Sequence, residues 1–165
     1  MTGAILHVPD TRRHDIMVTK GDLDNLQCLL SIHATHWSWK SVEYLVRELM
    51  RATIVDESSI PTDVVTMGSR VEYREEGGNS NQVVTLSYPG EREFVDDAIS
   101  VLTPIGAALL GLAVGQSICY AGPDGRPITL TVTRVVYQPE ANSRLRSKSR
   151  PRSVPGQVVS ISEDR

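Results

Sequence analysis

The sequence is poor in aromatic side chains: its 165 residues include one phenylalanine, two tryptophans and five tyrosines. It also lacks a long hydrophobic run, because the longest apolar stretch, residues 107–114, is interrupted by Gly111. That stretch falls well short of the ~20 residues that a transmembrane helix needs. No basic stretch followed by an apolar core marks a signal peptide at the N-terminus. These absences predict a protein without a membrane segment.

Cysteines and metal-binding motifs are scarce as well. The two cysteines, Cys28 and Cys119, make no metal-ligand spacing with the four histidines, and we expect both to be reduced in a cytoplasmic protein. No glycine-rich phosphate loop and no Gly-x-Ser-x-Gly elbow occurs. The adjacent acids Asp96 and Asp97 point apart in an extended chain and do not make a carboxylate pair. The sequence therefore predicts no metal, no cofactor and no catalytic residue.

Charge is distributed unevenly along the chain. The formal net charge is -3, from 17 basic and 20 acidic side chains, yet residues 141–165 hold six of the basic and two of the acidic ones. The first 140 residues keep eleven basic and eighteen acidic side chains, so the body is acidic and the tail is basic. Because duplex binding usually requires clustered Lys and Arg, the acidic body argues against a broad nucleic-acid face.

Two amphipathic helices are predicted in the first third of the chain. Thr19 and Asp22 have the spacing of a capping box, and leucines follow at helical spacing to about His33. A second helix begins after Ser38, with its apolar face at Val42, Leu45, Val46, Leu49, Thr53 and Ile54. The link between the two is short, so we expect residues 17–60 to form an antiparallel helical hairpin, or short coiled coil, after a flexible arm at residues 1–16.

From residue 61 the apolar pattern changes to a period of two. Strands are predicted at residues 70–74, 84–88, 99–102, 117–120 and 128–137, with a turn at residues 77–81. Thr103 followed by Pro104 is a helix start, and the short helix after it is apolar nearly all round. Residues 61–141 therefore predict an α+β fold: an antiparallel sheet with one short helix packed against it.

The last segment, residues 142–165, is rich in Ser, Arg and Pro and is expected to be disordered. A basic strip runs through it, made of Arg144, Arg146, Lys148, Arg150 and Arg152. The strip is either a solvated tail that needs no partner or a weak, salt-dependent contact to nucleic acid.

Side chains at the hairpin tip allow several interpretations. His33 and His36 have a spacing that could hold a metal, but without a third ligand a capping and packing role is favoured. Trp37 and Trp39 either pack between the hairpin and the sheet or form an exposed anchor for a partner.

Four sequence motifs, in this order, resemble the Rnk family, named for regulators of nucleoside diphosphate kinase, and more distantly the C-terminal domain of bacterial Gre transcript-cleavage factors. The motifs are DVVTMGSRV at 63–71, LSYPG at 86–90, SVLTPIGAALLGL at 100–112 and YQPEA at 137–141. The resemblance covers roughly residues 19–141. It implies an FKBP-like domain preceded by a helical hairpin.

The resemblance further implies that the partner is RNA polymerase, approached at its secondary channel. The family's polymerase contact surrounds the start of the short helix, a position occupied here by Leu102, Thr103, Pro104 and Ile105. Gre factors carry acids at the tip of a long coiled coil, where they help to hold a magnesium ion for RNA hydrolysis. The tip here, residues 31–38, contains no acid, and the arms are shorter.

We therefore expect a cytoplasmic transcription regulator that binds RNA polymerase and does not cleave RNA, with its oligomeric state left open. One alternative is a nucleic-acid-binding module that acts through the arginine-rich tail. A second is a peptidyl-prolyl isomerase, suggested only by the FKBP-like fold, although its pocket requires aromatic walls and Phe94 is the one phenylalanine.

Overall fold

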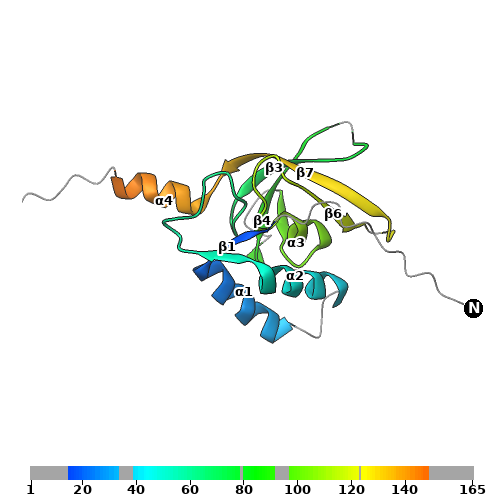
Figure 1. The fold of residues 1–165 in the computed structure, drawn as a ribbon, viewed down its shortest axis with the longest axis horizontal. Helices are drawn as coiled ribbons and strands as arrows, with labels where there is room; N and C mark the ends of the chain where they lie inside the picture. The colour runs from blue at the N-terminus through cyan, green and yellow to red at the C-terminus, as the bar shows by residue number, and fades with distance from the viewer. Residues whose placement is uncertain (1–14, 34–38, 79, 92–96, 123, 149–165) are drawn as a thin grey trace, which may run out of the picture.

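A computed structural model describes residues 15–33, 39–78, 80–91, 97–122 and 124–148. In this structure a curled sheet lies over three helices, and a fourth helix projects from one end (Figure 1). The elements are, in chain order, β1 (Met17–Thr19), α1 (Lys20–His33), α2 (Trp39–Arg51), β2 (Thr53–Val55), β3 (Arg70–Glu75), β4 (Gln82–Ser87), β5 (Ala98–Ser100), α3 (Pro104–Leu109), β6 (Ser117–Ala121), β7 (Pro127–Tyr137) and α4 (Pro139–Lys148).

The main sheet has the strand order β5-β4-β3-β7-β6. The β3–β4 hairpin and the β6–β7 hairpin are antiparallel, as is the pairing of β3 with β7. The predicted α+β arrangement of a sheet with one short helix is confirmed, but not every strand is antiparallel, because β5 runs parallel to β4. A parallel neighbour requires a crossover in place of a tight turn, and residues 88–97 form that connection.

A second, two-stranded sheet lies at the base of the α1–α2 pair. β1 and β2 are parallel, with Val18 opposite Ile54, and the amide of Thr53 donates to the carbonyl of Ile16 at 2.9 Å. The sequence interpretation was wrong here, because it extended the second helix through Thr53 and Ile54. All three residues of β2 are β-branched, and such residues favour a strand once a partner strand is available.

The N-terminal boundary also differs from the prediction. Ile16, expected to end a flexible arm, is 1% exposed and belongs to the core. The amide of the next residue, Met17, donates to the carbonyl of Gly111 at 3.1 Å, which fixes this point of the chain against the C-terminal half. Residues 1–14 lie outside the described residues.

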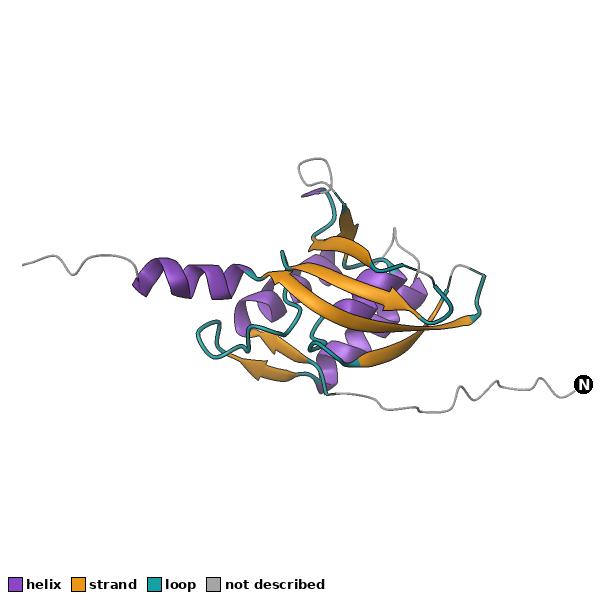
Figure 2. Cartoon of the chain, turned by 90° about the horizontal axis from the view of Figure 1, so that it is seen from above, coloured by secondary structure: helices purple, strands orange, loops and turns teal. Residues whose placement is uncertain are grey.

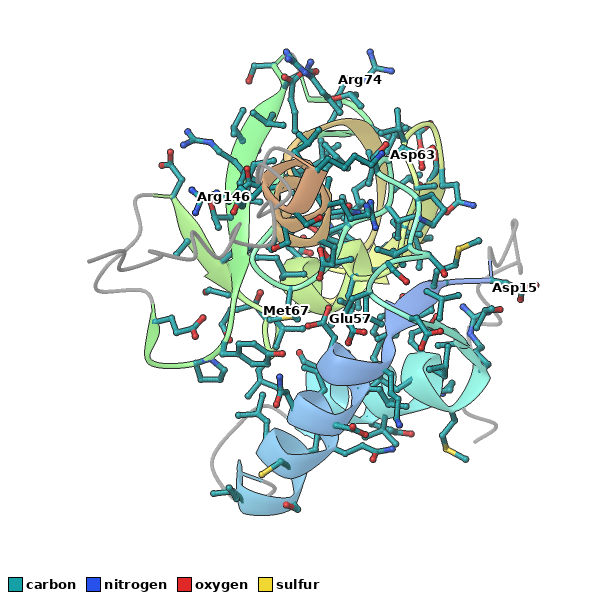
Figure 3. All side chains as sticks on the ribbon, turned by 90° about the vertical axis from the view of Figure 1, so that its left-hand side faces the viewer. Asp15, Glu57, Asp63, Met67, Arg74 and Arg146 are labelled. Carbon is teal, nitrogen blue, oxygen red and sulfur yellow. The ribbon has the colours of Figure 1, made fainter. Side chains whose placement is uncertain are left out.

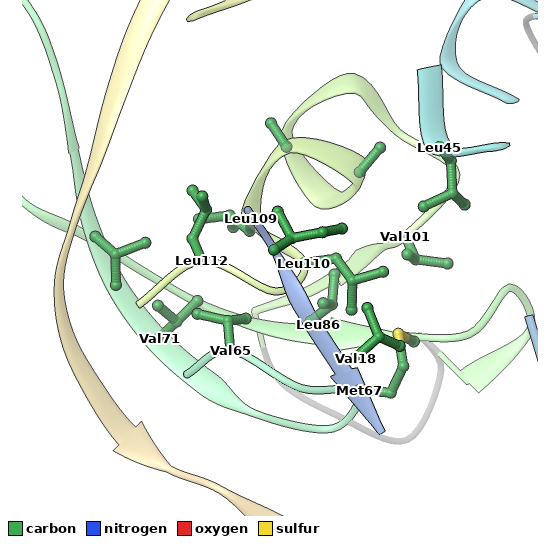
Figure 4. Close-up of a cluster of buried hydrophobic side chains, with 14 of the residues drawn as sticks. Val18, Leu45, Val65, Met67, Val71, Leu86, Val101, Leu109, Leu110 and Leu112 are labelled. Atoms are coloured by element: carbon green, nitrogen blue, oxygen red, sulfur yellow. The ribbon is translucent and has the colours of Figure 1, made fainter. Parts of the chain in front are cut away.

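The α1–α2 pair shares one core with the sheet. Leu26 of α1 and Leu45 and Leu49 of α2 belong to the same buried cluster as residues of β1, β4 and α3 (Figure 4). α2 lies against α3, while α1 lies beside β1 and β2. The hairpin leucines are therefore buried against the rest of the fold, α2 against α3 and α1 against β1 and β2, and not chiefly against each other. On the exposed side of α2, Glu43 and Arg47 form an ion pair at 3.2 Å.

The prediction of disorder from residue 142 is wrong for residues 142–148, which belong to α4. Pro139 occupies the first position of this helix, where no backbone donor is lost, and Glu140 in the first turn suits the helix dipole. Residues 149–165 lie outside the described residues.

Within the described part of the chain, no helix is both long enough and apolar enough to cross a membrane.

Candidate functional site

The start of α3 is held by a side-chain cap. Thr103 has extended backbone angles, φ -82° and ψ 156°, and its Oγ1 accepts a hydrogen bond from the amide of Gly106 at 3.1 Å. The same hydroxyl donates to the carbonyl of Ser100 at 2.7 Å. Pro104 follows at the first helical position. The predicted cap is thus confirmed, and it ties the helix start to the end of β5.

Gly106 allows α3 to approach β5 closely. A Cβ atom at this position would lie 2.1 Å from the carbonyl oxygen of Ser100, a distance that no side chain tolerates. Residues Ala107, Ala108 and Leu109 are buried. The helix is therefore set rigidly into the core, and its first turn has a fixed position on the surface.

The four residues predicted to contact RNA polymerase differ in exposure. Leu102 is 2% exposed and packs in the core, so it has no surface to offer a partner. Thr103 and Ile105 are half-buried, and Pro104 is exposed. The accessible part of the predicted contact is therefore the surface of Thr103, Pro104 and Ile105. Leu102 belongs to the core next to it.

The hairpin tip is only partly described. α1 ends at His33 and α2 begins at Trp39, and the side chains of both lie outside the described residues, as do His36 and Trp37 entirely. The proposed roles of these four residues therefore remain predictions. The acids nearest to the tip in α1 are Asp22 and Asp24, at the opposite end of the helix.

Asp22 links α1 to the main domain, a role that the sequence analysis missed. The amide of Asp22 donates to Thr19 Oγ1 at 3.1 Å, which is half of the predicted capping box. Its carboxylate, however, accepts from the amide of Met67 at 3.1 Å and from the hydroxyl of Tyr88 at 3.4 Å. Figure 3 shows Met67 beside the start of α1. The family motifs at 63–71 and 86–90 contain these partners, but their spacing does not reveal the contact.

The electrostatics of Asp22 reflect its position. Burial raises the pKa of the Asp22 carboxyl group above its ordinary value of 3.8, the hydrogen bond from Met67 opposes that increase, and the charge of Glu140 adds to it. Burial also raises the pKa of the Tyr88 phenol. Tyr88 therefore remains a hydrogen-bond donor to Asp22 across the physiological range.

A second polar cluster fixes the base of α4. Thr66 Oγ1 donates to Glu140 Oε2 at 2.7 Å, and the Thr66 amide donates to Ser69 Oγ at 3.1 Å. The side-chain amide of Gln138 donates to the carbonyls of Pro61 and Val64, each at 2.8 Å. Glu140 and Gln138 thus anchor the helix start to the loop between β2 and β3.

The basic strip is divided by the structure. Arg144 is half-buried, and its guanidinium donates to the carbonyl of Glu57 at 2.8 Å and to Gln138 Oε1 at 3.4 Å. Arg146 and Lys148 are exposed on α4. Arg150 and Arg152 lie outside the described residues. Arg144 therefore contributes to anchoring α4, and the next two basic residues face solvent.

Candidate metal ligands do not cluster in the described part of the chain. In that part of the chain, no group of three or more His, Cys, Asp or Glu side chains is arranged to hold a metal ion. Cys28 is exposed and Cys119 half-buried, and both are free thiols.

Known proteins are similar to this chain over the sheet domain and, for one relative, over more of the chain. The family model "Transcription elongation factor, GreA/GreB, C-term" matches residues 60–137. A regulator of nucleoside diphosphate kinase from Escherichia coli strain K12 is 38% identical over 129 residues, which cover 78% of this chain and 94% of that protein. Transcription elongation factor GreA from Clostridium botulinum is 32% identical over 81 residues, 49% of this chain and 51% of that factor.

A solved structure agrees with these matches. The prokaryotic transcription elongation factor GreA/GreB from Nitrosomonas europaea has a TM-score of 0.61 and 35% sequence identity, and the alignment covers 74% of this chain and all of that one. The match to the regulator extends over nearly its whole length. The chain therefore belongs to the Rnk and GreA/GreB family of transcription factors.

Proposed function

We propose that this protein regulates transcription by binding RNA polymerase through the start of α3. The observation that supports the proposal is an exposed Pro104 on a helix whose position is fixed by the Thr103 cap and by the close approach at Gly106. This surface lies inside the segment that matches the GreA/GreB family model. Pro104 and Ile105 form a small apolar centre, and such centres carry much of the binding energy in protein interfaces.

In the proposed complex, the protein docks near the secondary channel in the cytoplasm and places its α1–α2 pair at the channel entrance. It does not stimulate RNA cleavage. Residues 31–38 contain no acidic side chain, whereas a magnesium ion requires oxygen ligands of the carboxylate type. Each arm is also short: α1 has 14 residues and, at ~1.5 Å per residue, spans about 20 Å.

The docking surface is tested by capture of the purified polymerase on immobilised protein. Pro104→Asp is expected to weaken capture about tenfold or more, because it places a charge in the apolar centre. The fold should persist, since an acid in the first turn of a helix suits the dipole. Pro127→Asp, a matched change at an exposed proline at the start of β7, should leave capture unchanged. Equal capture by the wild type and Pro104→Asp would refute the docking surface.

The absence of cleavage has its own test. Stalled transcription complexes with magnesium, incubated with this protein, should show the same rate of RNA shortening as complexes without it. A GreA protein serves as the positive control in the same assay. Accelerated shortening by this protein would contradict the proposal on cleavage and leave the docking surface untouched.

A further inference from the structure

The outer face of the main sheet carries arginines and hydroxyl groups, in contrast to the acidic body. Strand pairing places Arg74 opposite Thr131, and Glu72 opposite Arg134, on the face away from buried Val71 and Tyr73. In the described part of the chain the helices α1, α2 and α3 lie under the other face, so the strands stand in front of them in Figure 2.

The basic side chains on this face are available for a partner. Arg74 and Arg134 are exposed, and no described carboxylate is within ion-pair distance of either. One acid among them, Glu72, accepts hydrogen bonds from Asn81 at 2.5 Å and from Thr133 at 3.2 Å. The Glu72 carboxylate is therefore bound by neutral donors, and the guanidinium groups of Arg74 and Arg134 remain free to contact an anion.

Helix α4 extends this face beyond the sheet. Arg70 is paired with Tyr137, the last residue of β7, and α4 begins two residues later. The helix has no buried residue, and a ten-residue helix of this kind is marginal on its own. Its direction is nevertheless fixed, because Gln138 and Arg144 hold its base against the loop between β2 and β3.

The projecting half of α4 is basic. Arg146 and Lys148 are exposed, and residues 144–152 contain five basic and no acidic side chains. In Figure 3, which looks toward the projecting helix, Arg74 and Arg146 both lie on the part of the molecule away from α1. We call these four exposed basic side chains of the sheet and of α4 the arginine face: Arg74, Arg134, Arg146 and Lys148.

We propose that the arginine face binds the phosphate backbone of a nucleic acid. Its length supports this partner: the six steps from Thr131 to Tyr137 span about 20 Å at ~3.3 Å each, and ten helical residues add about 15 Å. A path of about 35 Å corresponds to one turn of duplex, which offers roughly 20 phosphate charges. Neighbouring hydroxyls add to this: in the Ser117 and Thr131 pair, 2.7 Å apart, one hydroxyl donates to the other and leaves the second O–H for a phosphate.

The chemistry of the arginine face favours a phosphate backbone over an acidic protein. Protein interfaces need a buried apolar centre. On β7 the exposed large apolar side chains, Val136 and Tyr137, lie at the end of the strand, whereas the positions around Arg74 carry threonine and serine. Backbone contacts need only positioned cations and hydroxyls, and they carry little sequence information. We therefore expect weak binding with a strong dependence on salt and little dependence on base sequence. This surface is separate from the α3 surface that we propose for the polymerase.

The experiment measures binding of the full chain to two fluorescein-labelled probes, a 20-nucleotide single-stranded RNA and a 20-base-pair DNA duplex, by fluorescence anisotropy from 25 to 200 mM KCl. Two variants remove two charges each, Arg74→Gln with Arg134→Gln on the sheet, and Arg146→Gln with Lys148→Gln on α4. Each should weaken binding several-fold and reduce the slope of log K against log salt by about 1.5, since each phosphate contact contributes about 0.7–0.9.

The matched control, Lys20→Gln with Arg47→Gln, removes two exposed charges from α1 and α2 and should change neither the affinity nor the slope. Which probe binds more tightly distinguishes RNA from DNA as the ligand. Equal losses in the control and in the two test variants would show a nonspecific charge effect and overturn the proposal. So would a loss of polymerase capture in the test variants without any change in probe binding. Pro104→Asp should bind the probes normally, which separates this proposal from the polymerase surface.

Discussion

At the scale of single residues, the Thr103 hydroxyl is the main determinant of the α3 start. It accepts from Gly106 and donates to Ser100, so Thr103→Ala removes two hydrogen bonds at once. We expect the free energy of unfolding to fall by about 1–2 kcal/mol, the range measured for lost helix caps. Thr103→Ser keeps the hydroxyl and should recover most of the loss in urea denaturation. An unchanged free energy of unfolding in Thr103→Ala would show that the cap does not stabilise the helix.

Gly106 is required for a different reason, namely the lack of room for a side chain. Gly106→Ala would force α3 away from the Ser100 carbonyl, and overpacking of this kind costs about 1–3 kcal/mol or more. Gly21→Ala in α1 is a suitable control, because its Cβ would meet only the flexible end of Glu57, and alanine favours a helix. Urea unfolding should rank Gly106→Ala as clearly destabilising and Gly21→Ala as neutral or mildly stabilising.

Asp22 should make stability depend on pH. Because burial raises its pKa in the folded state, its protonated form is favoured by folding, and that contribution is complete below the unfolded value of 3.8. The contribution is lost as pH rises through the higher folded value. Asp22→Asn does not titrate, so the stability of the wild type relative to this variant should fall between pH 4 and pH 7. Urea unfolding of both proteins across that range tests the sign. A difference that is constant or that rises with pH would contradict it.

At the scale of elements, α4 depends on contacts at its base. Gln138 is 3% exposed and donates to two backbone carbonyls. Gln138→Ala removes this donor from the Val64 carbonyl, whereas the Pro61 carbonyl still accepts from the Val64 amide at 3.3 Å. We expect a loss of about 1–3 kcal/mol and faster hydrogen exchange throughout residues 139–148. Ser147→Ala, at an exposed position on the same helix, is the control and should leave exchange at the helix base unchanged.

The elements that the sequence predicted well are those specified locally. The Thr19 and Thr103 caps, the alternation in β3 and β7, and the β3–β4 turn depend on neighbouring residues, and the structure contains all of them. The errors concern β2, the direction of β5, and α4. Each of these depends on a partner distant in sequence: Ile16 for β2, β4 for β5, and the loop after β2 for α4.

For the candidate site, the sequence predicted the position along the chain but not the exposure of each side chain. The motif at 100–112 identifies the α3 start, but it cannot show that Leu102 is buried while Pro104 is exposed, since that difference depends on how the chain turns after β5. Composition also identified the basic strip as a tail. It could not show that Arg144 anchors a helix, because the acceptor is a backbone carbonyl of Glu57.

At the scale of the whole molecule, the shared core predicts one cooperative unfolding transition. Leu26 and Leu45 of the α1–α2 pair are fully buried beside residues of the sheet. Both tryptophans, Trp37 and Trp39, belong to the hairpin segment, so tryptophan fluorescence reports on it alone. The fluorescence and far-ultraviolet circular dichroism curves in urea should therefore coincide. Separated midpoints would indicate that residues 17–60 and 61–141 unfold as independent domains.

Leu45→Ala provides a stronger version of this test. Removal of a fully buried leucine costs about 2–5 kcal/mol, and with a shared core both signals should shift to lower urea by the same amount. Val46→Ala, at a partly exposed position on the same helix, should shift neither curve appreciably. A shift of the fluorescence curve alone would contradict the shared core.

The parallel pairing of β1 with β2 also bears on how this architecture can diversify. It joins the start of α1 to the end of α2. Matched insertions at the opposite end of the pair can therefore lengthen both helices without disturbing the strand pairing or the core. The length of the two helices can therefore change turn by turn while the sheets and the core that carry them stay the same.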